Sequence, residues 1–134
     1  MNNLGLAAEN RCVLLVDDDA AVRGAMRRTL VQAGLSVVEA ECGDVASEML
    51  EGAETFDLLV TDVRMPGQRD GMALACDWRR RMPGRPILFV SGYSREHFDA
   101  ALLGSSEAVL HKPFQRALLL STVLRLLDGG ANSR

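Results

Sequence analysis

Short apolar runs followed directly by polar side chains recur along this chain, and they constrain the fold more than any other feature. The clearest run is Leu58–Val60, which leads to Asp62 before Pro66 and Gly67 turn the chain. An apolar run without polar alternation is typical of a parallel strand that is buried on both faces. Open parallel α/β sheets form their sites at the carboxyl ends of strands, so the sequence predicts a site around Asp62.

Three other predicted strands also end in groups that would cooperate with Asp62. These strands and the residues that follow them are Cys12–Val16 with Asp17, Asp18 and Asp19, Ile87–Val90 with Ser91 and Gly92, and Ala108–Leu110 with His111, Lys112 and Pro113. In sequence order, the strand ends therefore carry an acid cluster, a lone Asp, a hydroxyl and a Lys-Pro pair. The pattern predicts one pocket that gathers all four groups.

Segments with helical spacing of apolar residues separate these strands. The predicted helices cover residues 20–33, 44–51, 71–82 and 114–127, one further helix runs from a Ser94 cap to Gly104, and a second strand covers 35–39. Strands that alternate with helices predict a parallel sheet with right-handed crossovers and helices on both faces.

This succession of strand-end groups resembles the receiver domain of two-component response regulators. The resemblance covers about residues 11–128, with 1–10 expected to be a flexible lead-in and 129–134 a tail. It implies a doubly wound, flavodoxin-like (βα)5 fold whose five-stranded parallel sheet has the order 2-1-3-4-5, an order that periodicity alone does not give. The long loop between Pro66 and Gly71 resembles receivers of hybrid histidine kinases or their single-domain relatives.

Composition limits the other possibilities. The chain has 134 residues, of which 48% are hydrophobic and 25% charged, which is ordinary for a single globular domain. A net charge of -3 argues against a non-specific nucleic-acid binder. No apolar run is long enough for a membrane span, and the N-terminus lacks a signal-peptide pattern. We therefore expect a cytoplasmic protein without nucleic-acid or membrane partners.

The acid cluster predicts a metal site. Asp17, Asp18 and Asp62 would repel one another in one pocket unless a cation lies among them, and an all-oxygen ligand set favours Mg²⁺. The resemblance implies that Asp18, Asp62 and the backbone carbonyl of Arg64 contact the ion directly and that Asp17 acts through water. The alternative is that Asp17–Asp19 are only helix-capping acids.

The resemblance also implies a phospho-accepting role for Asp62. Its carboxylate would take a phosphoryl group from the phosphohistidine of a sensor histidine kinase or a histidine phosphotransfer protein. Lys112 and Ser91 would bind phosphoryl oxygens, although Ser91 could instead only cap a turn. Lys112 is the only lysine in the chain. Such a protein is not an enzyme in the usual sense, because it catalyses only its own phosphorylation and dephosphorylation.

Two features concern how a signal would leave the site. Val109 occupies the position where receivers usually have Tyr or Phe, so a switch that starts at Ser91 must propagate differently or more weakly. The last predicted helix is apolar over much of its circumference, which fits either a wide core contact or a surface for a homodimer or effector. We expect no output domain in this chain, and we expect output through protein contact or through a phosphoryl group passed to a histidine phosphotransfer protein.

A haloacid-dehalogenase-type phosphatase is the alternative function. That family also begins with a strand followed by Asp-x-Asp, which Asp17 and Asp19 match. It needs a further acidic pair after its lysine, whereas only Asp128 follows Lys112 here. It also gives Asp62 no role, and the receiver interpretation is therefore preferred.

Overall fold

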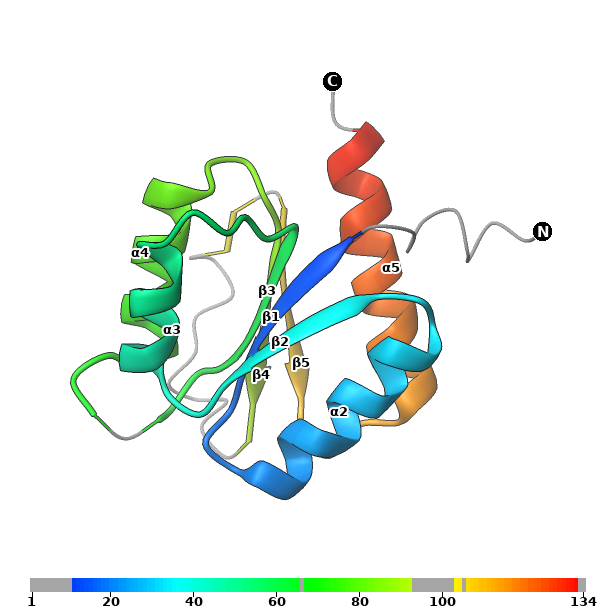
Figure 1. Ribbon diagram of the computed structural model, residues 1–134. Coiled ribbons are helices and arrows are strands. Elements are labelled where there is room, and N and C mark those ends of the chain that lie inside the picture. Colours follow the sequence, from blue (N-terminus) through cyan, green and yellow to red (C-terminus); the bar gives the residue numbers. More distant parts are fainter. Residues whose placement is uncertain (1–10, 66, 93–102, 105, 133–134) are drawn as a thin grey trace.

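The computed structural model describes residues 11–65, 67–92, 103–104 and 106–132 (Figure 1). Its strands are β1 Cys12–Val16, β2 Ser36–Ala40, β3 Leu58–Asp62, β4 Ile87–Ser91 and β5 Glu107–His111. Its helices are α2 Ala20–Gln32, α3 Gly43–Leu50, α4 Gly71–Arg81 and α5 Arg116–Asn132. None of these helices is both long and apolar enough to cross a membrane. The helix predicted after Ser94 falls largely outside the described residues.

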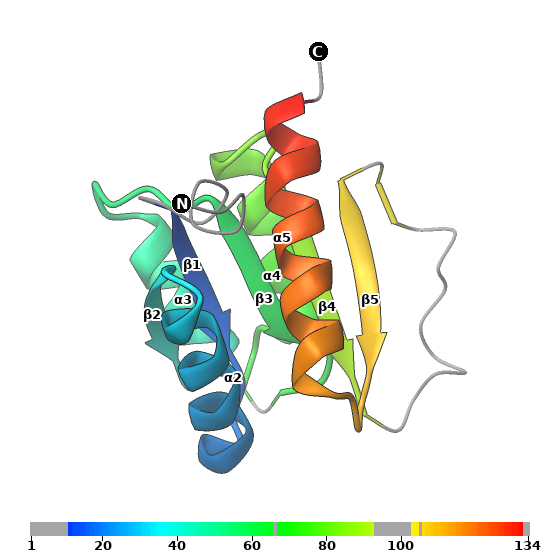
Figure 2. The ribbon, with the colours of Figure 1, turned by 90° about the vertical axis from the view of Figure 1, so that its right-hand side faces the viewer.

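All strands are parallel, and the sheet order is β2-β1-β3-β4-β5, which confirms the predicted architecture. Figure 2 shows the strand arrowheads pointing to the same edge of the sheet, so the carboxyl ends of β1, β3, β4 and β5 lie along that edge. A parallel sheet of this order places β1 and β3 side by side, because β2 lies outside β1. The strand ends with acidic residues are therefore neighbours.

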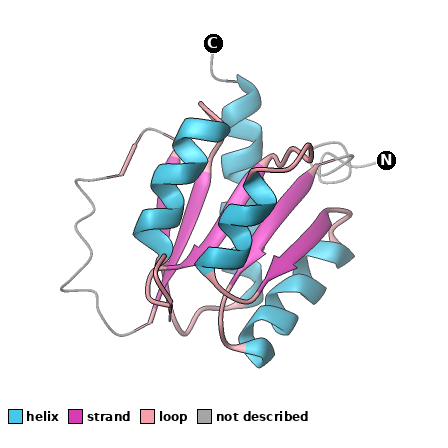
Figure 3. Cartoon of the chain, turned by 60° about the vertical axis from the view of Figure 1, so that its left-hand side comes forward, coloured by secondary structure: helices cyan, strands magenta, loops and turns pink. Residues whose placement is uncertain are grey.

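Helices cover both faces of the sheet, with α2 and α5 on one face and α3 and α4 on the other (Figure 3). Alternate residues of β1 point to opposite faces: Val13 and Leu15 pack with the α2 and α5 cluster, and Leu14 and Val16 with the α3 and α4 cluster. Trp78 of α4 is fully buried in the second cluster. The two cores hold the sheet rigid, so the strand ends have fixed positions.

Helix α5 differs from its prediction at both ends. It begins at Arg116 instead of Phe114, and it continues to Asn132 past the predicted end at Leu127. A glycine ends a helix mainly by adopting a positive φ, as Gly34 does after α2 with a φ of 98°. Gly129 has no such φ and stays within the helix. The predicted tail is therefore helical up to residue 132.

The apolar surface of α5 is mostly used by the core. Leu119, Val123 and Leu127 are buried, and further leucines of the helix pack against the same cluster while partly exposed. Leu118 is 50% exposed, and it is one of two large apolar side chains in the described part of the chain that face solvent, the other being Val31. A dimer or effector surface on α5 stays a prediction.

The first residue of α4 packs directly against the end of β3. The N–H of Gly71 donates to the carbonyl of Val63 at 2.8 Å. A Cβ at Gly71 would lie 2.1 Å from the carbonyl oxygen of Asp62 and 2.8 Å from the Cα of Val63. This contact leaves no room for a side chain, so glycine at this position lets α4 approach the strand end that carries Asp62.

Replacing Gly71 with alanine is expected to lower the free energy of unfolding by about 2 kcal/mol, because helix and strand must separate. Gly129→Ala is the matched control. A Cβ at Gly129 meets nothing within 4 Å, and alanine is the better helix former, so stability should rise by up to about 1 kcal/mol. Urea unfolding measures both variants. A Gly71→Ala protein as stable as wild type would contradict the close packing.

Candidate functional site

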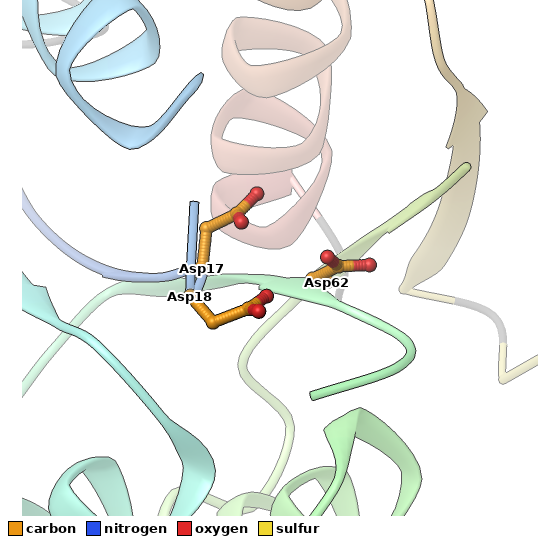
Figure 4. Close-up of side chains that lie close together, drawn as sticks. All are labelled: Asp17, Asp18 and Asp62. Atoms are coloured by element: carbon orange, nitrogen blue, oxygen red, sulfur yellow. The ribbon is translucent and has the colours of Figure 1, made fainter. Parts of the chain in front are cut away.

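Three carboxylates meet at the carboxyl edge of the sheet. Asp17 follows β1, Asp18 is next to it, and Asp62 ends β3. One carboxylate oxygen from each lies within 4.8 Å of those of the other two (Figure 4). Asp17 is fully buried, Asp62 is partly buried and Asp18 is exposed. The structure thus brings together the acids that the sequence placed in one pocket.

Lys112 lies between two of these acids. Its Nζ donates to Oδ2 of Asp17 at 3.2 Å and to Oδ2 of Asp62 at 3.3 Å. Its backbone N–H donates to the carbonyl of Ser91 at 2.8 Å, and its peptide bond to Pro113 is cis. Lys112 follows β5, and β4 lies between β5 and β3 in the sheet. Its ammonium thus reaches Asp62 past the end of β4, from the side of β3 that faces away from β1.

Burial raises the pKa of Asp62, and the nearby charge of Asp17 raises it further. The charge and hydrogen bond of Lys112 and the backbone N–H of Arg64 lower this pKa, but they do not outweigh burial and repulsion. Burial alone would lower the pKa of Lys112, and the charges and hydrogen bonds of Asp17 and Asp62 reverse that effect and raise it. One ammonium cannot balance three carboxylates, so an excess of negative charge remains.

This donor set fits a hard divalent cation. The ligand atoms are all carboxylate oxygens, which is the chemistry that Mg²⁺ selects. The cluster opens into a cleft of about 860 Å³. The residues that line this cleft are Asp18, Asp19, Val22, Asp62, Val63, Arg64, Ser91, Gly92, Lys112 and Pro113. The cleft leaves space for water ligands, which Mg²⁺ usually retains in proteins.

Asp19 performs the capping role that was the alternative for the whole acid cluster. It is the N-cap of α2, and its Oδ1 accepts the N–H groups of Ala21 at 3.0 Å and Val22 at 3.2 Å. Asp17 accepts the N–H of Asp19 at 2.9 Å, while its other oxygen faces Lys112. Helix capping therefore accounts for one acid and leaves Asp17 and Asp18 for the cluster.

The other predicted site residues differ in whether they line the cleft. Ser91 is the last residue of β4 and is buried, and Arg64 is exposed. Both residues line the cleft. A Cβ at Gly92 would approach only the Lys112 side chain, at 3.9 Å, so the cleft is open there. Val109 does not line the cleft. It is half-buried in the middle of β5, in register with Phe89 of β4, and packs with the α3 and α4 cluster.

Arg23 is a residue of the site that the sequence analysis did not identify. From the second turn of α2, its guanidinium donates to the backbone carbonyl of Asp17 at 2.6 Å and to Oε1 of Glu39 at 2.9 Å. The sequence contained one signal of this role. Arg23 lies four residues after the Asp19 cap, and residues four apart are neighbours on a helix surface, so Arg23 lies on the side of α2 that is near the end of β1.

The loop after Asp62 is anchored by a second network that the sequence did not indicate. Asp44 of α3 accepts the N–H of Arg69 at 3.0 Å, and the Arg69 guanidinium lies 3.1 Å from Oδ2 of Asp77 on α4. Asp77 is 7% exposed and also binds the hydroxyl of Ser47 at 2.8 Å and Arg80 at 2.8 Å. Arg69 thus holds the loop before Gly71 against the α3 and α4 pair.

Comparison with known proteins gives a consistent result. The family model described as "Response regulator receiver domain" matches residues 13–124. The chain is 36% identical over 117 residues to Protein PetR of Rhodobacter capsulatus, covering 86% of this chain and 48% of that protein. It is 39% identical over 119 residues to the sensor kinase CckA of Brucella abortus, covering 87% of this chain and 12% of the kinase. The chain thus spans half or less of these curated relatives.

Solved structures show the same similarity. A response regulator receiver protein from Sinorhizobium medicae superposes with a TM-score of 0.84 at 33% identity, covering 93% of this chain and 98% of that one. The receiver domain of the hybrid histidine kinase CckA gives a TM-score of 0.73 at 34% identity, covering 87% of this chain and 98% of that one. A receiver of a hybrid kinase is thus among the similar structures, as the loop after Asp62 indicated.

Replacing Asp77 with asparagine is expected to lower the free energy of unfolding by about 1–2 kcal/mol at pH 7, because charged hydrogen bonds are lost. Burial alone would raise the pKa of Asp77, but the Ser47 hydroxyl, Arg80 and Arg69 outweigh it and lower the pKa. The charged form therefore stabilises the fold above the unfolded-state pKa, and this contribution disappears as the pH falls through the lower folded-state pKa.

Urea unfolding of wild type and Asp77→Asn should accordingly show a difference at pH 7 that shrinks in acid, below about pH 4. Glu48→Gln, the same kind of exchange at an exposed acid on α3, is the control and should change stability by less than about 0.5 kcal/mol. A difference for Asp77→Asn that stays constant down to low pH would contradict the role of its charge.

Proposed function

Because this chain belongs to the response regulator receiver domain family, whose members are signalling modules, we propose that it accepts a phosphoryl group on Asp62. The donor is the phosphohistidine of a sensor histidine kinase or of a histidine phosphotransfer protein. The observation that carries the proposal is the placement of Asp62. Asp62 is the last residue of the central strand β3. Its Oδ2 accepts a hydrogen bond from Nζ of Lys112 at 3.3 Å, and its side chain lines an open cleft beside two further acids.

In the proposed reaction, an oxygen of Asp62 attacks phosphorus, and the P–O bond forms as the P–N bond of the phosphohistidine breaks. Phosphoryl transfer depends mainly on positioning and on neutralising the phosphoryl oxygens. The Lys112 ammonium already lies beside the nucleophile and would take one of these oxygens. The hydroxyl of Ser91, at the end of the adjacent strand, would bind another.

The residues that would hold Mg²⁺ are Asp18, Asp62 and the backbone carbonyl of Arg64, with Asp17 acting through water. When bound, the ion supplies positive charge to the phosphoryl oxygens. The excess negative charge of the cluster supports this assignment, since Lys112 alone does not balance it. Asp17 is held by Lys112 and by the N–H of Asp19, which keeps its carboxylate at the edge of the sheet.

Signal propagation in this chain would use the backbone rather than an aromatic side chain on β5. Val109 lies away from the cleft, packed opposite Phe89. Ser91 pairs with His111, the last residue of β5, and its carbonyl accepts the N–H of Lys112 at 2.8 Å. A movement of Ser91 toward a phosphoryl group would therefore shift the end of β5, which leads into α5. A homodimer or effector could then bind α5.

Incubation with acetyl phosphate and Mg²⁺ tests the proposal. We expect wild type to gain the mass of one phosphoryl group and Asp62→Asn to gain none, because the nucleophile is lost. Asp57→Asn is the matched control, since this carboxylate lies at the other end of β3 and bonds the Cys12 N–H. It should be phosphorylated like wild type.

The phosphatase alternative predicts a different pattern. Rapid turnover of acetyl phosphate that survives in Asp62→Asn and is lost in Asp17→Asn would favour that alternative. Intact-protein mass spectrometry and phosphate release, measured on the same samples, distinguish the two results.

A further inference from the structure

We infer that Arg23 is a positioning residue for the cation site, and that it acts by fixing the peptide between Asp17 and Asp18. The inference rests on the proposed function, because it concerns the metal that phosphoryl transfer would use. Arg23 would touch neither a phosphoryl group nor the ion. Its effect passes through the backbone of the residues that would hold the ion.

The Arg23 side chain connects three elements. The residue lies on α2, where its backbone N–H donates to the carbonyl of the Asp19 N-cap at 2.9 Å. Its guanidinium reaches the Asp17 carbonyl at the end of β1 at 2.6 Å and Glu39 on β2 at 2.9 Å. The side chain is only 18% exposed, so these contacts are partly shielded from water. The guanidinium therefore connects the helix to the strand end through short hydrogen bonds.

The carbonyl that Arg23 binds belongs to the peptide that joins Asp17 to Asp18. A fixed carbonyl sets the orientation of that peptide plane, and therefore the direction in which the chain continues into Asp18. The N–H of Asp17 bonds the Ala40 carbonyl at 3.3 Å, which holds the other side of the residue. Without Arg23, the turn that carries two acids would lose one of its fixed points.

A cation beside a metal site would normally weaken the binding of a second cation. Here Glu39 offsets only part of this charge, because Glu39 also pairs with Arg27 at 3.2 Å. Any favourable contribution of Arg23 to the cation site must therefore be geometric. The planar guanidinium can donate in two directions at once, which the single ammonium of lysine reproduces poorly.

Arg27 offers a matched comparison on the same helix. It lies one turn further along α2, pairs with the other oxygen of Glu39 and has a side chain that is 48% exposed. Arg23→Lys and Arg27→Lys both keep the charge and both alter a pair with Glu39. Only Arg23→Lys removes a guanidinium that bonds both the Asp17 carbonyl and Glu39.

Isothermal titration calorimetry of the full chain with MgCl₂ tests the inference without any phosphoryl donor. We expect Arg23→Lys to weaken Mg²⁺ affinity about tenfold, as loss of an outer-shell partner does at other metal sites. Arg27→Lys should stay within about twofold of wild type, because its contacts are exposed. In the metal-free proteins, the amides of Asp17 and Asp19 should exchange hydrogen faster in Arg23→Lys than in wild type. Arg27→Lys should exchange them at the wild-type rate.

The outcomes separate the inference from the proposed function. If wild type binds Mg²⁺ and both lysine variants bind it equally well, the positioning role of Arg23 is overturned while the proposed function stands. If wild type itself does not bind Mg²⁺, the metal assignment and the inference both fail. Equal loss of affinity in both lysine variants would also overturn the inference, since the Asp17 contact would then not be the cause.

Discussion

Mutual repulsion among Asp17, Asp18 and Asp62 is the constraint on which the site depends, because the fold forces these carboxylates together. Their strands are neighbours in the sheet, so the pairing of β1 and β3 keeps Asp17 and Asp62 close, with Asp18 next to Asp17. Lys112 relieves part of the repulsion from a position 50 residues away from Asp62 in the chain. The remaining negative charge gives the cleft its attraction for a cation. A cation bound there would add to the positive charge of Lys112, which is what an oxygen-rich phosphoryl group requires.

The strand-end groups were predictable because burial and strand direction determine where they lie. Apolar runs such as Leu58–Val60 must be covered on both faces, and their polar ends must then share one edge. Sheet order was not available from periodicity and came from the family resemblance. The end of α5 was missed because a glycine pair looks like a stop, whereas Gly129 keeps a helical backbone.

Supporting residues were harder to predict, since their roles depend on tertiary contacts. Arg23 resembles its neighbours Arg27 and Arg28 in sequence, and only the approach of α2 to the end of β1 distinguishes it. Asp77 reads as an ordinary polar residue of α4, and only the packing of α3 beside α4 gives it Ser47 as a partner. Side chains on the sheet edge thus form the proposed phospho-acceptor site, while these partners contact the adjoining turns and loops.

The most direct test of the central claim is to locate the phosphoryl group chemically. After reaction with acetyl phosphate and Mg²⁺, borohydride reduces an aspartyl phosphate to homoserine, and peptide mass spectrometry identifies the modified residue. If Asp62 is the phospho-acceptor, homoserine forms at position 62 and at no other aspartate. Modification of Asp17 or Asp19 instead would contradict it, because those acids would then be nucleophiles rather than supports of a cation site.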